Sequence, residues 1–310
     1  MLKRTRSFLV LVMLLMTVTM SAQVTTATMS GKVTAQDEPI IGATIVAIHE
    51  PSGTRYGTVT NVSGQFNLQG MRTGGPYKVE ISYVGYQTAI YKGINLLLGE
   101  NYVLNVSLKE SSELLDEVVV TASKESNMKS DRAGAIMNAN RDMISNTPTI
   151  SRSISDIMRL SPQGADVGNG FAVGGGNYRQ SFVTVDGAAF NNTFGLGGNL
   201  PANGSPISLD ALEQVTVAVT PFDVRQSGFT GGAINAVTRS GDNQFRGTAY
   251  MYFNNENLKG SKVDDYELLR SKAQYYTYGA SFGGPIIKDK LFFFVNGEYE
   301  DNVTAGSNYR

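Results

Sequence analysis

The chain has 310 residues, of which 41% are apolar and 17% charged, and its formal net charge is −1. A net charge this close to zero gives no sign of the basic surface that nucleic-acid binding requires. The absence of cysteine excludes a disulfide framework. The 34 Gly, 15 Tyr and 14 Phe favour strands and turns. We therefore expect a mainly β protein with two or three domains.

The N-terminus has the layout of a secretory signal peptide over residues 1–23. Lys3, Arg4 and Arg6 precede an apolar run over residues 8–18, and small residues follow it. The alternative is an uncleaved membrane anchor, for which the run is short. Because no cysteine follows the run, a lipid-anchored lipoprotein is excluded.

Residues 24–109 alternate short β-prone runs with turn residues, a spacing that predicts a small β-sandwich. The single histidine, His49, stands at a strand end. We expect it to be a partly exposed sandwich residue, because a metal site needs several ligands at close spacing. The expected strands cover residues 29–35, 43–49, 55–61, 64–70, 77–86 and 101–108.

Residues 110–124 read as a polar linker that contains one strand-prone stretch, LDEVVVTA, at 115–122. Three consecutive valines favour an extended strand, although no partner strand is evident nearby. Such a segment suits pairing with the sheet edge of another protein. The alternative is that residues 118–120 form an ordinary strand of a neighbouring domain.

Residues 125–241 are rich in Gly and Asn, but recurring apolar runs predict a small α+β unit with long loops. The expected elements are a helix over 151–162 with Ile154, Ile157 and Met158 on one face and Pro162 at its end, a strand over 180–190 that ends in a turn at Asp186 and Gly187, and a short helix over 208–214.

Residues 242–310 change to a period of two, which is typical of transmembrane β-strands about ten residues long. Two further runs, 274–284 and 290–300, show this alternation less cleanly, with Leu291, Phe293, Val295, Gly297 and Tyr299 on one face of the latter. The first run is QFRGTAYMYFN, at 244–254. Its apolar face comprises Phe245, Gly247, Ala249, Met251 and Phe253, and its other face comprises Gln244, Arg246, Thr248 and Tyr250.

The connections between these runs are unequal. The first, 256–273, is long and charged, whereas the second, 284–290, is short. Outer-membrane barrels have long outside loops and short periplasmic turns, so we expect the first link outside the cell. An ordinary soluble antiparallel sheet is the alternative. Three strands cannot close a barrel, and our hypothesis is that the chain is the N-terminal part of a longer membrane protein.

Several phrases resemble known families. PIIGATIVAIHE (39–50) and GPYKVEISYVGYQT (75–88) resemble the carboxypeptidase-regulatory-like domain, a transthyretin/Ig-like sandwich also classed as carbohydrate-binding-like. EQVTV (213–217) and GFTGGAINAVTRSG (228–241) resemble the plug domain of TonB-dependent outer-membrane receptors, closest to the Oar-like branch of Bacteroidetes type. The resemblance implies a sandwich, then a plug, then the first strands of an incomplete transmembrane barrel.

By that resemblance, the chain is part of a receptor in the cell outer membrane with its sandwich in the periplasm. TonB, with an ExbB/ExbD-type motor complex, supplies the energy, and the other implied partners are outer-membrane lipids, an imported glycan, peptide or siderophore-like ligand, and a surface lipoprotein. The TonB-box-like segment comprises Leu115, Asp116, Glu117, Val118, Val119, Val120, Thr121 and Ala122.

Plug loops over 168–180 and 191–199 offer polar groups to a ligand, or else pack against the barrel wall. Their candidate ligand-facing residues are Asn169, Asn177, Tyr178, Arg179, Asn191 and Asn192. No catalytic residue, cofactor or metal site is expected, because one histidine and no cysteine leave no nucleophile with its base. The alternative function is a secreted or surface carbohydrate-binding adhesin without transport activity.

Overall fold

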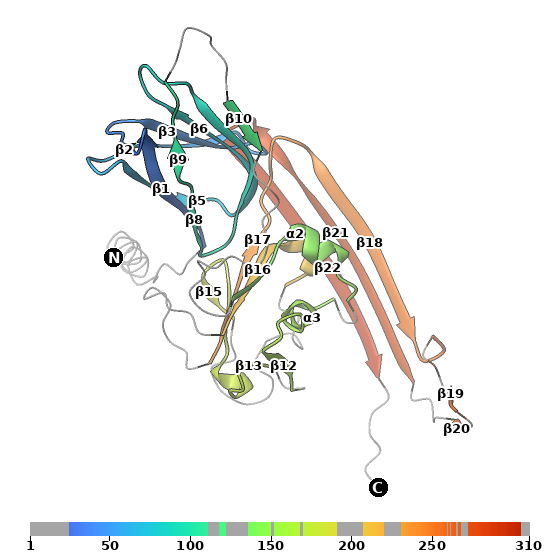
Figure 1. Cartoon of the computed structure of the whole chain (residues 1–310). Coiled ribbons are helices and arrows are strands. Elements are labelled where there is room, and N and C mark those ends of the chain that lie inside the picture. Colours follow the sequence, from blue (N-terminus) through green and yellow to red (C-terminus); the bar gives the residue numbers. More distant parts are fainter. Residues whose placement is uncertain are drawn as a thin grey trace, which may run out of the picture.

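The computed structural model describes residues 25–110, 118–121, 136–149, 152–167, 170–190, 207–219, 231–258, 260, 262–264, 266–267 and 272–304. A β-sandwich, a small α+β unit and three long strands follow one another along the chain (Figure 1). No helix among the described residues is long and apolar enough to cross a membrane. The predicted signal peptide lies outside the described residues.

The sandwich consists of two sheets that enclose one apolar core. In the first sheet β1 pairs with β2 and β5 and, in parallel, with β8 and β9, and the second has the order β10-β7-β6-β3-β4. Its strands are β1 (Ala27–Ala35), β2 (Glu38–Pro39), β3 (Thr44–His49), β4 (Thr54–Val59), β5 (Gln65–Met71), β6 (Gly74–Ser82), β7 (Ala89–Leu96), β8 (Asn101–Val103), β9 (Val106–Ser107) and β10 (Val118–Thr121).

Most of the strands expected in the sandwich form close to the predicted positions, and alternate residues such as Ile45 and Ala47 are buried in the core. Three expectations were wrong. The strand predicted over 101–108 is split into β8 and β9, β7 was not foreseen, and His49 is only 5% exposed. His49 is buried because the period of two places it on the same inward face as Ile45.

The α+β unit, which we call the plug, has a central sheet with the order β11-β16-β17-β14-β15. Its core includes Leu212, Val215 and Ile234, all fully buried. The elements are β11 (Ile136–Ala139), α2 (Arg141–Asn146), α3 (Ile154–Met158), β12 (Gly164–Asp166), β13 (Phe171–Val173), η2 (Tyr178–Gln180), β14 (Phe182–Val185), β15 (Ala188–Ala189), η4 (Leu209–Ala211), β16 (Leu212–Ala218) and β17 (Ala233–Thr238).

The predictions made from local sequence patterns in the plug were partly confirmed. Helix α3 buries the predicted face of Ile154, Ile157 and Met158, and positive φ angles at Asp186 and Gly187 form the predicted turn. The helix expected over 208–214 was wrong, because only the single turn η4 forms and Leu212 already begins β16. Tertiary pairing with β11 and β17 extends this segment and outweighs its local helical tendency.

The third unit is a sheet of long antiparallel strands, β18 (Arg246–Asn255), β21 (Ala273–Ile287) and β22 (Leu291–Thr304), accompanied by the short pair β19 (Lys262–Val263) and β20 (Tyr266–Glu267). The predicted alternation is confirmed. Met251 and Val295 are each 63% exposed on the apolar face, whereas Thr248 and Tyr250 make hydrogen bonds to the plug.

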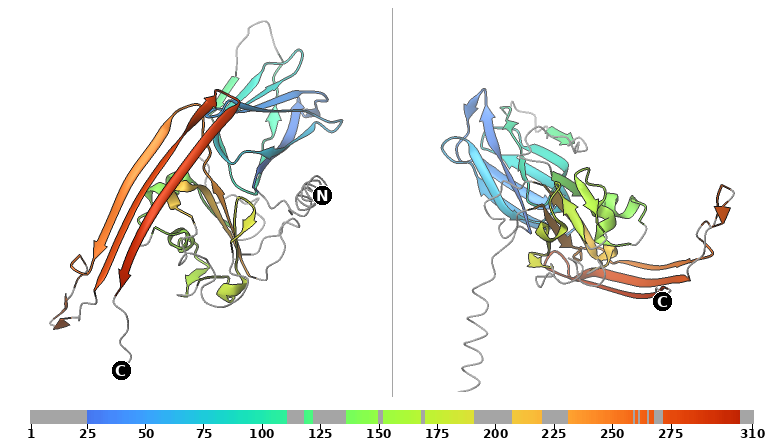
Figure 2. Two further views of the ribbon diagram at one scale, coloured as in Figure 1. Left: turned by 180° about the vertical axis from the view of Figure 1, so that it is seen from behind. Right: turned by 90° about the horizontal axis from the view of Figure 1, so that it is seen from below.

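The three units have a clear arrangement. The plug lies against one side of the curved sheet formed by β18, β21 and β22 (Figure 2). The sandwich lies at the end of this sheet where the short turn after β21 leads into β22, and the long link between β18 and β21 lies at the opposite end (Figure 1). Hydrogen bonds that join the sandwich to the other two units support this placement.

Candidate functional site

Within the TonB-box-like segment, the structure describes residues Val118–Thr121, which form β10; Leu115, Asp116, Glu117 and Ala122 lie outside the described residues. Strand β10 pairs in parallel with β7, with Val118 opposite Ala89 and Thr121 opposite Lys92. It forms the outer edge of the second sandwich sheet (Figure 1). The segment is therefore an extended strand docked on the sandwich, which is the alternative that the sequence left open.

A polar network joins the plug to the long strands, and its centre is Asp210 in η4. Arg141 Nη2 donates to Asp210 Oδ1 over 3.0 Å, and Thr248 Oγ1 in β18 donates to Oδ2 over 2.6 Å. Arg239 Nη1 lies 3.8 Å from Oδ2 and also donates to the Asp210 carbonyl over 3.3 Å. One carboxylate thus connects two plug cations to a barrel strand.

The network continues through Ser208 and across the sheet. Ser208 Oγ lies 2.8 Å from the Tyr250 hydroxyl and donates to Glu298 Oε2 over 3.0 Å. Tyr250 also donates to Glu298. Arg152, from the loop before α3, donates to the Tyr252 hydroxyl over 2.7 Å and lies over its ring. Two separate segments of the plug, before α3 and before η4, therefore contact the inward face of the strands.

The electrostatics of the network favour an ionised Asp210. Burial opposes its ionisation, but hydrogen bonds from Ser281, Thr248 and Arg141 outweigh burial and hold the carboxyl pKa below its usual value. In contrast, burial raises the pKa of the neighbouring Glu213. Asp210 is thus the fixed anion that keeps two nearby arginines compensated.

The sandwich contacts the plug and the barrel through fewer bonds. The Leu98 amide donates to Gln214 Oε1 in β16 over 3.1 Å, and Asn138 Nδ2 in β11 donates to Glu100 Oε1 over 2.8 Å. Asn243 donates its amide hydrogen to the Pro51 carbonyl over 2.9 Å. Arg72 reaches the Gly241 carbonyl at 3.4 Å. The first two bonds hold the loop after β7 against the plug sheet, and the other two hold Pro51 and Arg72 against the segment before β18.

His49 lies close to this junction without forming a ligand site. Its Nδ1 is 2.7 Å from Ser52 Oγ, and its ring lies 5.0 Å from that of Tyr77. Burial and the charge of Arg72 lower its pKa to about 4, against the opposing charge of Asp242. The imidazole is therefore neutral at pH 7, and no group of three metal-ligating side chains occurs among the described residues.

Three of the proposed ligand-facing residues are described, and they adjoin one another. Asn177 caps η2 by accepting from the Arg179 amide over 3.0 Å, and Arg179 Nε donates to the Tyr178 hydroxyl over 3.1 Å. Strand β13, which leads into η2, lies at the end of the plug far from the sandwich (Figure 1). Asn169, Asn191 and Asn192 lie outside the described residues.

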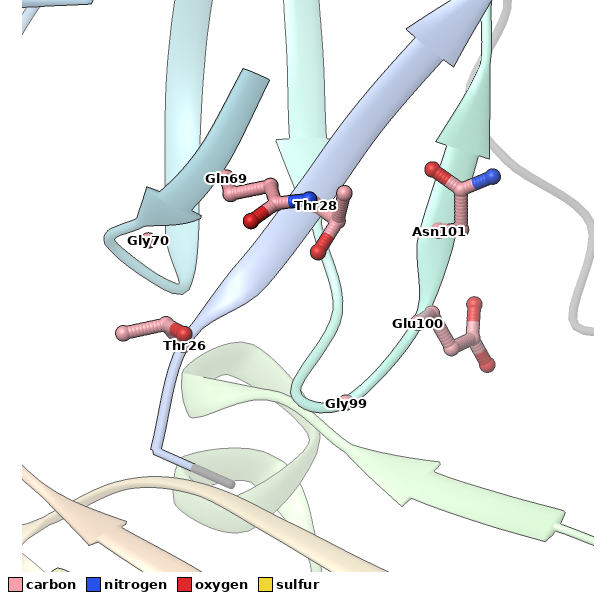
Figure 3. A pocket seen from close by; sticks show the side chains of 7 residues that line it. All are labelled: Thr26, Thr28, Gln69, Gly70, Gly99, Glu100 and Asn101. Atoms are coloured by element: carbon pink, nitrogen blue, oxygen red, sulfur yellow. The ribbon is translucent and has the colours of Figure 1, made fainter. Parts of the chain in front are cut away.

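A hollow of about 590 Å³ opens where β1 and β8 begin and β5 ends, on the plug side of the sandwich (Figure 3). Its charged side chain, Glu100, already accepts a hydrogen bond from Asn138. The hollow therefore belongs to the contact between the sandwich and the plug that is described above. It is lined by Thr26, Thr28, Gln69, Gly70, Gly99, Glu100 and Asn101.

Sequence reasoning missed the side chains that join the units. Asp210, Arg141 and Arg239 stand far apart in the chain, and no local pattern predicts that they meet. A weak signal existed in the inward face of the first barrel strand, where the alternation places Thr248 and Tyr250 opposite the apolar residues. Inward polar groups beside a folded plug require plug partners.

Two family models match the chain. The model described as the carboxypeptidase regulatory-like domain matches residues 28–109, and the one described as an outer membrane beta barrel domain matches residues 237–310. The first covers the sandwich up to Lys109, and the second covers the three long strands.

Named relatives agree with these matches. The TonB-dependent transporter Oar of Myxococcus xanthus is 31% identical over 152 residues, which are 47% of this chain and 14% of the relative. The TonB-dependent receptor SusC of Bacteroides thetaiotaomicron is 28% identical over 281 residues, 86% of this chain and 26% of the relative. The chain thus spans only about a quarter or less of each relative.

A solved structure, the siderophore receptor PirA from Acinetobacter baumannii, aligns with 54% of this chain and 24% of its own at a TM-score of 0.43 and 20% identity. That score is too low to support an argument. The outer membrane beta barrel match supports the transmembrane interpretation of residues 242–310 over an ordinary soluble sheet. The chain thus combines a carboxypeptidase regulatory-like domain with strands of an outer membrane beta barrel domain, and it is similar to TonB-dependent receptors of the outer membrane.

Proposed function

We propose that the chain forms the periplasmic sandwich, the plug and the first barrel strands of a receptor that imports a ligand with energy delivered by TonB. Residues 115–122 serve as the site where TonB binds. The observation that carries the proposal is β10, a short extended strand at a sheet edge placed directly before the plug.

Main-chain chemistry explains why such a strand suits this role. An edge strand presents unpaired N–H and C=O groups to which another chain can add a strand. The affinity then comes from the backbone, whatever the side chains are. Residues 122–135 join β10 covalently to β11, so a pull on the segment reaches the plug. The plug then moves relative to the barrel and opens a path for the ligand.

The proposal leaves the ligand class open among glycans, peptides and siderophore-like compounds. We propose that the ligand meets the plug at η2, where Asn177, Tyr178 and Arg179 lie at the end far from the sandwich. If the sandwich is periplasmic, that end faces outward together with the long link after β18. A TonB-linked motor of the ExbB/ExbD type completes the assembly, and a surface lipoprotein is a further candidate partner.

The test compares Val119→Pro with Val119→Ala in the full-length receptor. Proline removes one main-chain donor and restricts the backbone, whereas alanine keeps both. We expect Val119→Pro to weaken binding of the purified TonB C-terminal domain at least tenfold, measured by calorimetry on detergent-solubilised receptor. Val119→Ala should bind within twofold of the parent. Equal binding by Val119→Pro and the parent would contradict the proposal.

A further inference from the structure

The strand proposed to bind TonB is not a free peptide, because β10 is already part of the sandwich sheet. All four of its residues pair with β7, which β6 flanks on the other side. Parallel pairing is slightly less stable per residue than antiparallel pairing, and β10 pairs over four residues only. Among the described pairings of this sheet, the one between β10 and β7 is the shortest and the only parallel one, so we expect it to be the weakest.

The loop that follows β7 contacts the plug. Two residues after β7 ends at Leu96, the Leu98 amide bonds to Gln214, and Glu100 accepts from Asn138. At the same end of the sandwich, Pro51 and Arg72 make hydrogen bonds to the start of the barrel. The sandwich therefore makes hydrogen bonds both to the plug and to the start of the barrel, which are the two units that would move apart during transport.

Two routes can consequently carry a force applied to β10. While β10 is paired with β7, the force is borne by the sandwich and its contacts with the plug and barrel. After β10 separates, the force passes along residues 122–135 into β11 of the plug. The pairing between β10 and β7 determines which route is used.

We propose that the pairing of β10 with β7 is a mechanical latch, which must open before a pull by TonB reaches the plug. The inference rests on the proposed function. It adds an order of events: β10 separates from the sandwich first, and the plug sheet is loaded second. The sandwich then acts as a support that shields the plug from weak or brief pulls.

A disulfide across the latch provides the test. Lys92 is exposed and lies opposite Thr121, and the parent chain has no cysteine, so Lys92→Cys with Thr121→Cys introduces the only thiols in this part of the receptor. Neighbouring strands are about 5 Å apart, which suits a disulfide. Failure of this pair to cross-link under a mild oxidant would overturn the inference.

The measurement is single-molecule pulling on the full-length receptor in a supported bilayer, with the TonB C-terminal domain on the cantilever. In the reduced double variant we expect an early low-force event that adds at most about 50 Å, the extended length of residues 122–135. In the oxidised form that event should disappear, and dithiothreitol should restore it. An early event that is the same in both forms would overturn the latch.

Controls separate this inference from the proposed function. Each single cysteine variant, treated with the same oxidant, should retain the early event. If the TonB domain binds Val119→Pro as well as the parent, the proposed function fails and the latch fails with it. If binding depends on residue 119 but oxidation leaves the traces unchanged, only the latch fails.

Discussion

The plug has two interfaces that are built differently. Towards the barrel strands, several side chains converge on Asp210, and two arginines depend on its charge. Towards the sandwich, single hydrogen bonds join Leu98 to Gln214 and Asn138 to Glu100. Removing a charge from the first interface leaves cations uncompensated, whereas bonds of the second can open one at a time. The difference indicates that the sandwich separates from the plug more readily than the plug leaves the barrel.

The strongest test of this difference is Asp210→Ala. The substitution leaves Arg141 and Arg239 without their shared carboxylate, and we expect it to cost about 3–5 kcal/mol of local stability. Hydrogen exchange of the β16 amides in the purified receptor measures this loss. The exposed Glu267→Ala serves as the control and should change exchange little.

The same site has a defined pH dependence. Because the folded-state pKa of Asp210 is lowered, its contribution to stability is complete above the ordinary carboxyl pKa and disappears as the pH falls through the folded value. Faster β16 exchange on acidification should therefore occur in the parent and be reduced in Asp210→Ala. An identical acid response in both proteins would contradict the role of this carboxylate.

An intermediate effect is expected for Gly241→Ala, at the point where both interfaces meet. A methyl group there would lie 2.8 Å from the Gly284 carbonyl oxygen and closer still to the Phe293 carbonyl oxygen. Neither backbone segment can shift at low energetic cost, so we expect local stability to fall by about 1–3 kcal/mol. Faster hydrogen exchange at the start of β18 would measure this loss. Gly297→Ala has open space within 4 Å and should behave like the parent.

The smallest effect is expected for Gln214→Met on the sandwich side. The Leu98 amide loses its acceptor, but the buried Gln214 Nε2, which has no partner among the described residues, is removed as well. The two effects partly cancel, and we expect a net loss of about 1 kcal/mol of local stability. Exchange should accelerate at Leu98 but not at the β16 amides. Gln65→Met, at an exposed position, is the matched control.

Local patterns predicted those parts of the fold that depend on a single segment. The alternation around Met251 assigned the two faces of the first barrel strand correctly, and Ile154, Ile157 and Met158 formed the buried side of their helix. The segment at 208–214 failed because pairing with two distant strands outweighed its local preference. The sequence left open that residues 118–120 form a strand of a neighbouring domain, but it did not identify the partner strand, because β7 was itself missed.

Periodicity and turn residues predicted the mainly β character and the inward and outward faces of the long strands, because these signals act within a few residues. Tertiary structure alone decided that Val118–Thr121 pairs with Ala89–Lys92 and that Asp210 meets Arg141, Arg239 and Thr248. Such contacts join distant segments, and their partners are chosen by the packing of whole units.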